Sequence, residues 1–352
     1  MKKLSVICLI FALVATAFGN VAEFEKIVET YNTEKDFNGV VLVATDGKID
    51  FIRAIGLADR QSNRQISTTS KFKIASITKT FTAVLILKLY EQGKIDLNAT
   101  IGKYFPEYTG IGRDKVTIQQ LLTYSSGITD ESEKVEMRSF KSSLTLDEYI
   151  NKYCSGNLNF EPGSKSVYAN TEYIILGKII EKVTGKPYAK VLQKEILSPL
   201  KMKKSGMANS RKIVADSVKS YTQDKAKKDF NTDEPYLIEN FFAAGAMYST
   251  VEDLLKFDTA IFNAKLLQPK TTELMLKFYP VFGNVAFGFW GSDGYGNFAE
   301  KFYYRPGGIL GSTANWIHTT ETKKTIIVMS NTDATNLFEL SEKLYLESIS
   351  KK

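Results

Sequence analysis

An apolar stretch between Thr80 and Glu91 predicts a central helix. A helix from Ser76 to Glu91 would be about 24 Å long, and Gly93 would end it. Its apolar positions leave almost no polar face: Ala83, Val84, Leu85, Ile86, Leu87 and Leu89. Because a helix that is apolar all round is normally buried, we expect this one to lie inside the protein.

The segments before this helix predict one helix and a pair of strands. Residues 21–31 carry apolar side chains at helical spacing. Residues 40–45 and 48–55 are rich in β-formers, and the two residues between them, Asp46 and Gly47, favour the positive φ of a tight hairpin turn. The chain therefore begins as helix, strand, strand.

The segments after the central helix are helical first and mixed later. Helix patterns are found at 117–124, 144–153, 171–183, 251–262 and 337–349, with N-cap residues at the starts of 117–124 and 251–262 and Gly185 after 171–183. Strand patterns are found at 286–290, 302–304, 312–317 and 325–330. This order predicts an α/β (α+β) fold, an antiparallel sheet flanked by helices with an inserted helical lobe. The sheet lobe would comprise residues 20–75 and 210–352, and the helical lobe residues 76–209.

Residues 1–19 have the composition of a secretory signal peptide. Two lysines precede an apolar run from Leu4 to Val14, and small residues lead to Gly19. This run is too short for a membrane span. We therefore expect a protein exported to the periplasm or secreted, with a catalytic domain at residues 20–352 and no stable membrane span in the mature chain. With 43% hydrophobic residues, that domain is of ordinary globular composition.

Charge and the scarce residue types narrow the chemistry. The formal charge of +7 comes from lysines scattered without interleaved aromatics, so a nucleic-acid partner is not expected. The chain has one histidine, His318, and two cysteines, Cys8 and Cys154, of which Cys8 lies in the signal segment. This excludes a His/Cys zinc cluster, and no metal or organic cofactor is expected. A serine enzyme with this composition would use a lysine as its base, unless His318 served that purpose.

Ser76 and Lys79 form the first candidate catalytic pair. They share the start and one face of the central helix, and a serine hydroxyl needs a base such as a desolvated, neutral lysine within hydrogen-bond reach. The same spacing recurs at Ser70/Lys73, Ser198/Lys201 and Ser348/Lys351, but only Ser76/Lys79 opens a long buried helix. The alternative interpretation is a serine N-cap followed by a solvated lysine.

Two further motifs follow in the sequence. One is Tyr168-Ala169-Asn170, ahead of the helix at 171–183, and the other is Arg305-Pro306-Gly307-Gly308, expected between two strands. Each has a structural alternative, because the tyrosine could be an ordinary core or surface aromatic, the asparagine a helix N-cap, and the two glycines a turn.

In this order, the three motifs resemble those of the penicillin-recognising serine hydrolases, a family of class C β-lactamases, D-alanyl-D-alanine carboxypeptidases and related esterases. The resemblance covers about residues 24–335 and implies a β-lactamase/transpeptidase-like fold. It implies that Ser76 is acylated, that Lys79 is its base, and that Tyr168 shares the proton transfer and protonates the leaving group. The substrate would be bound by Asn170, Arg305, Gly307 and Gly308, with the backbone N–H groups of Ser76 and Gly308 forming the oxyanion hole.

The third motif departs from the family pattern. Arg305 and Pro306 replace the usual lysine or histidine and the usual serine or threonine. Arginine keeps the positive charge and can bind a carboxylate, but it cannot give up a proton. Proline supplies neither a hydroxyl nor an N–H donor. Turnover of β-lactams is therefore not favoured.

These features predict an exported serine hydrolase that forms an acyl-enzyme. Its substrate would be a small molecule or a peptidoglycan-derived compound, either a D-amino-acid peptide, as for a D-alanyl-D-alanine carboxypeptidase, or a small amide or ester. One alternative is a broad carboxylesterase that uses the same site. Another, suggested by Arg305-Pro306, is a catalytically silent protein that binds the cell wall.

Overall fold

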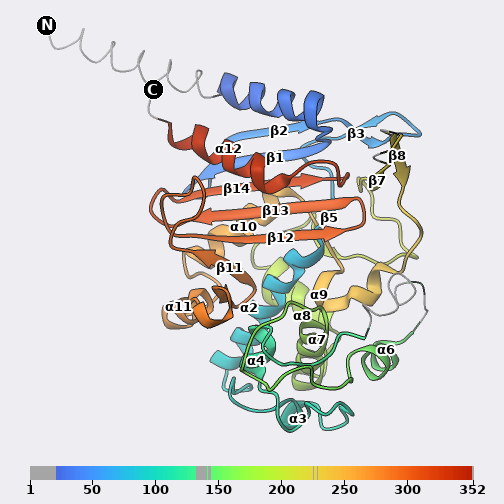
Figure 1. Cartoon of the computed structure of the whole chain (residues 1–352), viewed down its shortest axis with the longest axis vertical. Helices are drawn as coiled ribbons and strands as arrows, with labels where there is room; N and C mark the ends of the chain where they lie inside the picture. Colours follow the sequence, from blue (N-terminus) through green and yellow to red (C-terminus); the bar gives the residue numbers. More distant parts are fainter. Residues whose placement is uncertain (1–20, 132–140, 142–143, 225, 228, 351–352) are drawn as a thin grey trace, which may run out of the picture.

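The structure, a computed structural model, describes residues 21–131, 141, 144–224, 226–227 and 229–350. The predicted signal segment at residues 1–19 lies outside them. Within the described part, the chain forms a large antiparallel sheet with helices on both faces and a group of helices below it (Figure 1). The predicted fold class is confirmed.

The main sheet has seven strands in the order β10-β11-β12-β13-β14-β1-β2. Strands β1 (Gly39–Thr45) and β2 (Lys48–Ile55) form the predicted hairpin. On its other edge, β1 pairs with β14 (Lys324–Ser330), so that Gly39 lies opposite Ser330. The first and last strands of the chain are thus neighbours in the sheet.

Two of the predicted strands differ from expectation. The strand expected at 302–304 extends through the third motif as β12 (Phe302–Ile309) and pairs along its length with β13 (Ser312–Thr319). The expectation that this motif lies between strands was wrong. The strand expected at 286–290 is divided into β10 (Val285–Ala286) and β11 (Phe289–Ser292), because Gly288 adopts a positive φ of 83°.

Helices cover both faces of the sheet. The helix at residues 21–35 and α12 (Leu337–Ile349) pack on one face, and α10 (Val251–Phe262) and α2 (Thr78–Glu91) lie on the other (Figure 1). Strand β1 therefore buries both of its sides. Its alternate residues divide between two hydrophobic clusters, with Val41 and Val43 toward α12 and Val40, Leu42 and Ala44 toward α2 and α10.

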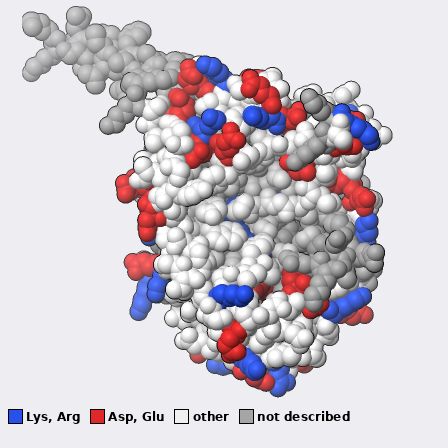
Figure 2. All heavy atoms as spheres, viewed as in Figure 1, with Lys and Arg blue, Asp and Glu red and all other residues white. Residues whose placement is uncertain are grey.

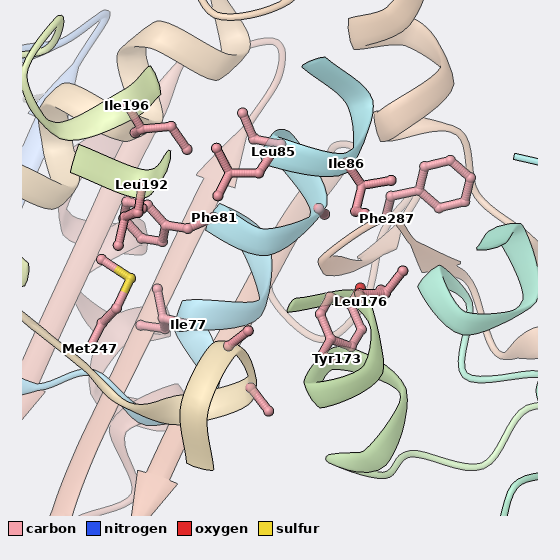
Figure 3. Close-up of a cluster of buried hydrophobic side chains, with 14 of the residues drawn as sticks. Ile77, Phe81, Leu85, Ile86, Tyr173, Leu176, Leu192, Ile196, Met247 and Phe287 are labelled. Carbon is pink, nitrogen blue, oxygen red and sulfur yellow. The ribbon is translucent and has the colours of Figure 1, made fainter. Parts of the chain in front are cut away.

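Helix α2 is the buried central helix that the sequence predicts. Residues Thr78 to Leu87 and Leu89 are all buried. Side chains from α7 (Thr171–Thr184), α8 (Tyr188–Leu192) and β9 (Met247–Ser249) surround it (Figure 3). The helix begins two residues later than expected, because Ala75–Ile77 form a separate 3₁₀ turn. This turn carries Ser76.

The other helices between the strands lie together below the sheet (Figure 1). They include α3 (Ile101–Tyr104), α4 (Ile118–Leu122) and α6 (Leu146–Tyr153). Thr117 and Thr145 form capping boxes at the starts of α4 and α6, and Gly185 ends α7 in the left-handed conformation. These caps are the start and stop signals that the sequence displays.

Short elements complete the fold. They are β3 (Leu57–Asp59), β4 (Arg64–Gln65), β5 (Phe72–Lys73), η3 (Gln193–Leu197), β6 (Gly206–Met207), β7 (Tyr221–Asp224), β8 (Asp229–Thr232), η4 (Ile238–Phe241), α9 (Phe242–Gly245), α11 (Pro269–Leu276) and η5 (Pro280–Phe282). Strands β5, β9 and β6 form a small sheet that leads into the turn with Ser76. None of the helices in the described ranges is long and apolar enough to cross a membrane.

Candidate active site

Ser76 is the middle residue of the 3₁₀ turn Ala75–Ile77 and is half-buried. The residue before it, Ala75, adopts a φ of 43°, which is strained for a residue with a side chain. Ser76 does not cap helix α2, because the N-cap position belongs to Ile77 and no side chain caps this end. The alternative interpretation of Ser76 as a simple N-cap is therefore wrong.

Lys79 is fully buried one turn after Ser76. Its Nζ lies 3.2 Å from Ser76 Oγ, 2.7 Å from Asn170 Oδ1 and 2.9 Å from the carbonyl oxygen of Ala244. A charged ammonium can donate to all three oxygens. A neutral amine can donate to Asn170 and Ala244 and accept the proton of the Ser76 hydroxyl. The second arrangement is the one that a general base requires.

The surroundings make Lys79 easier to deprotonate than a lysine in water. Burial lowers the pKa of Lys79 from 10.5 to about 8, with Tyr168 opposing this shift and the positive charge of Arg305 adding to it. At a pH slightly above neutral, a substantial fraction of Lys79 is therefore uncharged.

Tyr168 completes a cluster of three functional groups. Its Oη lies 2.6 Å from Ser76 Oγ, and its side chain is 39% exposed, so this part of the site is open to solvent. Burial acts to raise the pKa of the phenol, but the positive charges of Lys79 and Arg305 together outweigh it and lower that pKa. A lowered pKa makes the phenol a better proton donor than an ordinary tyrosine.

Asn170 holds Lys79 rather than capping a helix. Its backbone lies at the N-cap position of α7, yet its side chain makes no capping hydrogen bond there. Instead Oδ1 accepts from Lys79, and the backbone N–H donates to Asp130 Oδ2 at 3.1 Å. Asn170 is thus the N-cap residue of α7 by position, as the alternative interpretation predicts, but its side chain binds Lys79 instead of the helix end.

Arg305 lies underneath the cluster and is fully buried. Its Nε donates to the carbonyl oxygen of Ser76 at 2.9 Å. The guanidinium carbon lies 4.6 Å from the ring centroid of Trp290, 5.6 Å from that of Tyr168 and 6.0 Å from that of Tyr124. Nη1 and Nη2 are buried without a hydrogen-bond partner. In this arrangement, a substrate carboxylate cannot reach them from the solvent.

The rest of the third motif forms an open strand edge. Strand β11 pairs with β12 only as far as Trp290 opposite Tyr304, so that the following residues pair with β13 alone. Proline is tolerated in a paired strand where its missing N–H faces an open edge. Pro306 is exposed at such a position, and the N–H of Gly308, two residues later, faces the same edge. Gly307 lies against the turn with Ser76, since an added Cβ would come 2.3 Å from the carbonyl oxygen of Ile74.

Sequence reasoning missed two buried carboxyl groups next to Asn170. Asp130 binds the backbone of Asn170, and Glu172 accepts from Ser126 Oγ at 2.9 Å. Burial raises the pKa of Glu172 from 4.5 to about 8. The one available signal was the position of Glu172 in an otherwise apolar stretch of helix α7. In the described ranges, no three His, Cys, Asp or Glu side chains are placed to hold a metal ion.

Charged side chains lie mostly toward the rim of the face shown in Figure 2. The charges of the site are instead inside the protein, at Lys79 and Arg305, where they are weakly screened. One class of enzymes, the serine hydrolases, has this arrangement beside an antiparallel sheet: a half-buried serine in contact with a buried lysine and a tyrosine. The sequence matches the family described as Beta-lactamase over residues 24–349, and the chain belongs to this family of serine hydrolases.

Three known proteins illustrate the relationship. The chain is 28% identical over 251 residues to "Teichoic acid D-alanine hydrolase" of Staphylococcus aureus (strain MRSA252), a match that covers 71% of this chain but only 61% of the relative. It is 27% identical over 341 residues to "Penicillin-binding protein 4*" of Bacillus subtilis (strain 168), covering 90% and 72%. Its fold is similar to that of the octameric penicillin-binding protein homologue from Pyrococcus abyssi, with a TM-score of 0.82, 25% identity and coverage of 94% and 78%. The predicted family resemblance is confirmed.

Proposed function

We propose that this protein hydrolyses small amides or esters of D-amino acids through an acyl-enzyme on Ser76. The observation that carries the proposal is the contact of one hydroxyl with two proton-transfer groups, 2.6 Å to Tyr168 Oη and 3.2 Å to Lys79 Nζ. A serine becomes a useful nucleophile only when such a base is in reach.

In the first half of the reaction, neutral Lys79 takes the hydroxyl proton while Ser76 Oγ bonds to the substrate carbonyl carbon. The negative charge that develops on the carbonyl oxygen is stabilised by the N–H groups of Ser76 and Gly308. Tyr168 donates a proton to the leaving amine or alcohol as its bond to carbon breaks, and Lys79 returns a proton to Tyr168. In the second half, water attacks the ester at Ser76 with the same groups reversing these transfers.

The surroundings of the third motif do not favour a substrate whose leaving group carries a carboxylate to Arg305 and Pro306. Arg305 is buried with its terminal nitrogens covered, and Pro306 supplies no hydroxyl to the open edge. A D-alanyl-D-alanine carboxypeptidase and a β-lactamase both act on substrates that carry a carboxylate there. An ester or amide fits better, and the name of the staphylococcal relative refers to hydrolysis of D-alanine. We assign Arg305 an electrostatic role, through the pKa values of Lys79 and Tyr168.

Export and the division into lobes are part of the same proposal. The signal-like composition of residues 1–19 supports export. The names of two relatives, which refer to teichoic acid and to penicillin binding, also support it. Ser76 would lie between the sheet lobe at 20–75 and 210–352 and the helical lobe at 76–209. The turn at Ala75–Ile77 stands at the boundary between these ranges.

Covalent labelling tests the proposal. Purified protein is incubated with a 4-nitrophenyl ester and with a fluorescent penicillin, and the adduct is located by mass spectrometry. We expect the ester to leave an acyl group on Ser76, which Ser76→Ala abolishes. Ser198→Ala is the matched control, because Ser198 and Lys201 share the spacing but Ser198 is exposed outside the site. A label that survives Ser76→Ala would overturn the assignment of the nucleophile.

Turnover distinguishes the remaining alternatives. D-Alanine methyl ester and D-alanine amide should be hydrolysed faster than D-alanyl-D-alanine. Equal rates on the L-enantiomers and on simple acetate esters would instead identify a broad carboxylesterase. Retention of muropeptides, with neither label nor turnover, would identify a silent cell-wall-binding protein.

A further inference from the structure

A cavity of about 630 Å³ has Lys73, three residues before Ser76 in the sequence, in its wall. This volume is in the range of small-molecule sites. Its walls come from Lys73 of β5, Tyr248 of β9 and two segments at residues 208–220 and 232–238. Four lysines contribute to the lining: Lys71, Lys73, Lys212 and Lys219.

Lys73 is the most enclosed of these lysines. Its Nζ donates to Ser220 Oγ at 3.2 Å and lies 4.8 Å from the ring centroid of Tyr236. Among the residues that the structure describes, no carboxylate lies within 4.0 Å of this nitrogen, although Asp233 acts on it from further away. Burial lowers the pKa of Lys73, and the negative charge of Asp233 opposes this shift.

The acidic side chains in the wall already have partners. Asp233 accepts from Thr222 Oγ1 at 2.9 Å and from the backbone N–H of Gly311 at 3.1 Å. Glu234 is paired with Lys141 at 2.6 Å. Of the lysines, Lys219 pairs with Asp59 at 3.0 Å. Lys71 Nζ donates to the backbone oxygen of Ala215 at 2.9 Å, and Lys212 is exposed. The four lysines of the lining outnumber its two acidic side chains, Asp233 and Glu234, so the lining has a net positive charge.

One hydrophobic cluster connects the cavity wall with the candidate site. Tyr236 and Ile238 line it, and they pack in one hydrophobic cluster with Ala75 and Ile309. Ala75 precedes Ser76, and Ile309 follows Gly308 along β12. A substrate that lies along the open edge of β12 with its carbonyl at Ser76 would therefore extend past Ile309 toward the lysines.

We propose that this cavity is an anion-binding subsite that takes a phosphate or carboxylate group carried by the substrate. An oxyanion there would accept charge-assisted hydrogen bonds from Lys73 and Lys71 and would supply the charge that the enclosed ammonium lacks. The link to the substrate rests on the proposed function, whereas anion binding itself does not depend on acylation.

Titration calorimetry on the full chain tests anion binding, with glycerol 3-phosphate and succinate as probes and glycerol as the neutral control. We expect at least one anion to bind and glycerol not to bind. Lys73→Met should weaken the binding about tenfold or more, since a hydrogen bond between charged groups is worth about 1.5 to 3 kcal/mol. Lys212→Met should weaken it less, and being exposed, this variant has no reason to unfold. Lys190→Met, on the surface of α8, is the matched control and should bind like the wild type.

Turnover of two esters tests the link to the substrate. The neutral substrate is the 2-hydroxyethyl ester of D-alanine. The anionic substrate is the same ester with its free hydroxyl phosphorylated, or succinylated if succinate is the anion that binds. The wild type should have the higher kcat/KM for the anionic ester, and Lys73→Met should reduce this preference about tenfold. The proposal of an anion subsite would be overturned if neither anion binds. It would also be overturned if Lys73→Met and Lys212→Met leave the binding unchanged. If neither ester is hydrolysed, the proposed function fails and calorimetry still decides the subsite.

Discussion

Lys79 has three acceptors around one nitrogen, and its protonation state decides what Ser76 can do. When charged, it donates to Ser76 Oγ and holds the hydroxyl in place without activating it. When neutral, it keeps Asn170 and Ala244 as acceptors and has a lone pair left for the hydroxyl proton. The same three contacts thus position the lysine in both states.

This arrangement predicts the pH dependence of the first chemical step. The rate of acylation should follow the fraction of neutral Lys79, so that it rises with pH and levels off above about pH 8. The measurement is the rate of acyl-enzyme formation from a 4-nitrophenyl ester between pH 5 and 9, under single-turnover conditions. A rate that falls over this range would mean that the protonated lysine is the active form.

Tyr168→Phe removes one hydroxyl and leaves the ring. Because that hydroxyl lies 2.6 Å from Ser76 Oγ, kcat/KM should fall by about 10²- to 10⁴-fold, the usual contribution of a positioned acid or base. The melting temperature should change little, since the residue is 39% exposed. Tyr295→Phe is the matched control: Tyr295 and Asn297 repeat the spacing of the motif, but Tyr295 is 68% exposed. Equal activity of the two variants would remove Tyr168 from the mechanism.

At the residue scale, the sequence predicted that Ser76, Lys79 and Asn170 lie together. Three motifs in the order of a known family leave few choices for the side chains that contact the serine. It did not predict that Arg305 is buried. Which side of a strand a residue faces depends on the register, and the register is set by pairing with β13 far along the chain. Asp130 and Glu172 escaped notice for a related reason, since a carboxyl group in a sequence is normally on the surface.

At the scale of elements, the site depends on close packing of strand β12 against the turn Ala75–Ile77. Gly307 allows this approach, because a Cβ there would come 2.3 Å from Ile74 O, whereas a Cβ at Gly308 would meet nothing within 4 Å. Arg305 Nε ties the same two elements together through Ser76 O. The geometry of the serine is therefore set by the strand as well as by helix α2.

Alanine at these two glycines gives contrasting predictions. Gly307→Ala should lower the free energy of unfolding by about 1 to 3 kcal/mol, the usual cost of overpacking, and should slow acylation as the turn is displaced. Gly308→Ala should leave the stability near that of the wild type. Urea unfolding of both variants provides the comparison. Equal stabilities would show that the strand and the turn are less tightly packed than the contact at Gly307 indicates.

The elements that the sequence predicted well are those with local signals. Helices α4, α6, α7 and α10 have caps or end signals near the expected positions. Strand β12 was predicted too short because Pro306, Gly307 and Gly308 are turn formers by composition. Pairing with β13 overrides that preference. Likewise, Gly288 divides a predicted strand because it packs on α2, where a Cβ would come 2.8 Å from Thr80 Cα.

At the scale of the whole molecule, the two ends of the chain build the sheet and the middle supplies most of the helices below it. The alternation of strand and helix patterns along the chain was enough to predict this class of fold. The small sheet β5-β9-β6 was not predicted, because each of its strands has only two or three residues and pairs with distant partners. The convergence of Ser76, Tyr168 and Arg305 on one point makes the site a property of the complete fold.

Glu172 couples this buried centre to the stability of the whole protein. Its pKa is about 8 in the folded state against 4.5 as the ordinary value, so between these pH values the folded protein holds a proton that the unfolded chain has released. Stability should therefore decrease as pH rises through this window.

Glu172→Gln removes the titration while its amide oxygen can still accept from Ser126 Oγ. The melting temperature of this variant relative to the wild type should increase from pH 5 to pH 9. Exposed Glu273→Gln on α11 is the control and should show no such trend. A difference independent of pH would mean that the pKa of Glu172 is not raised by folding and that its carboxyl group is already charged at pH 5.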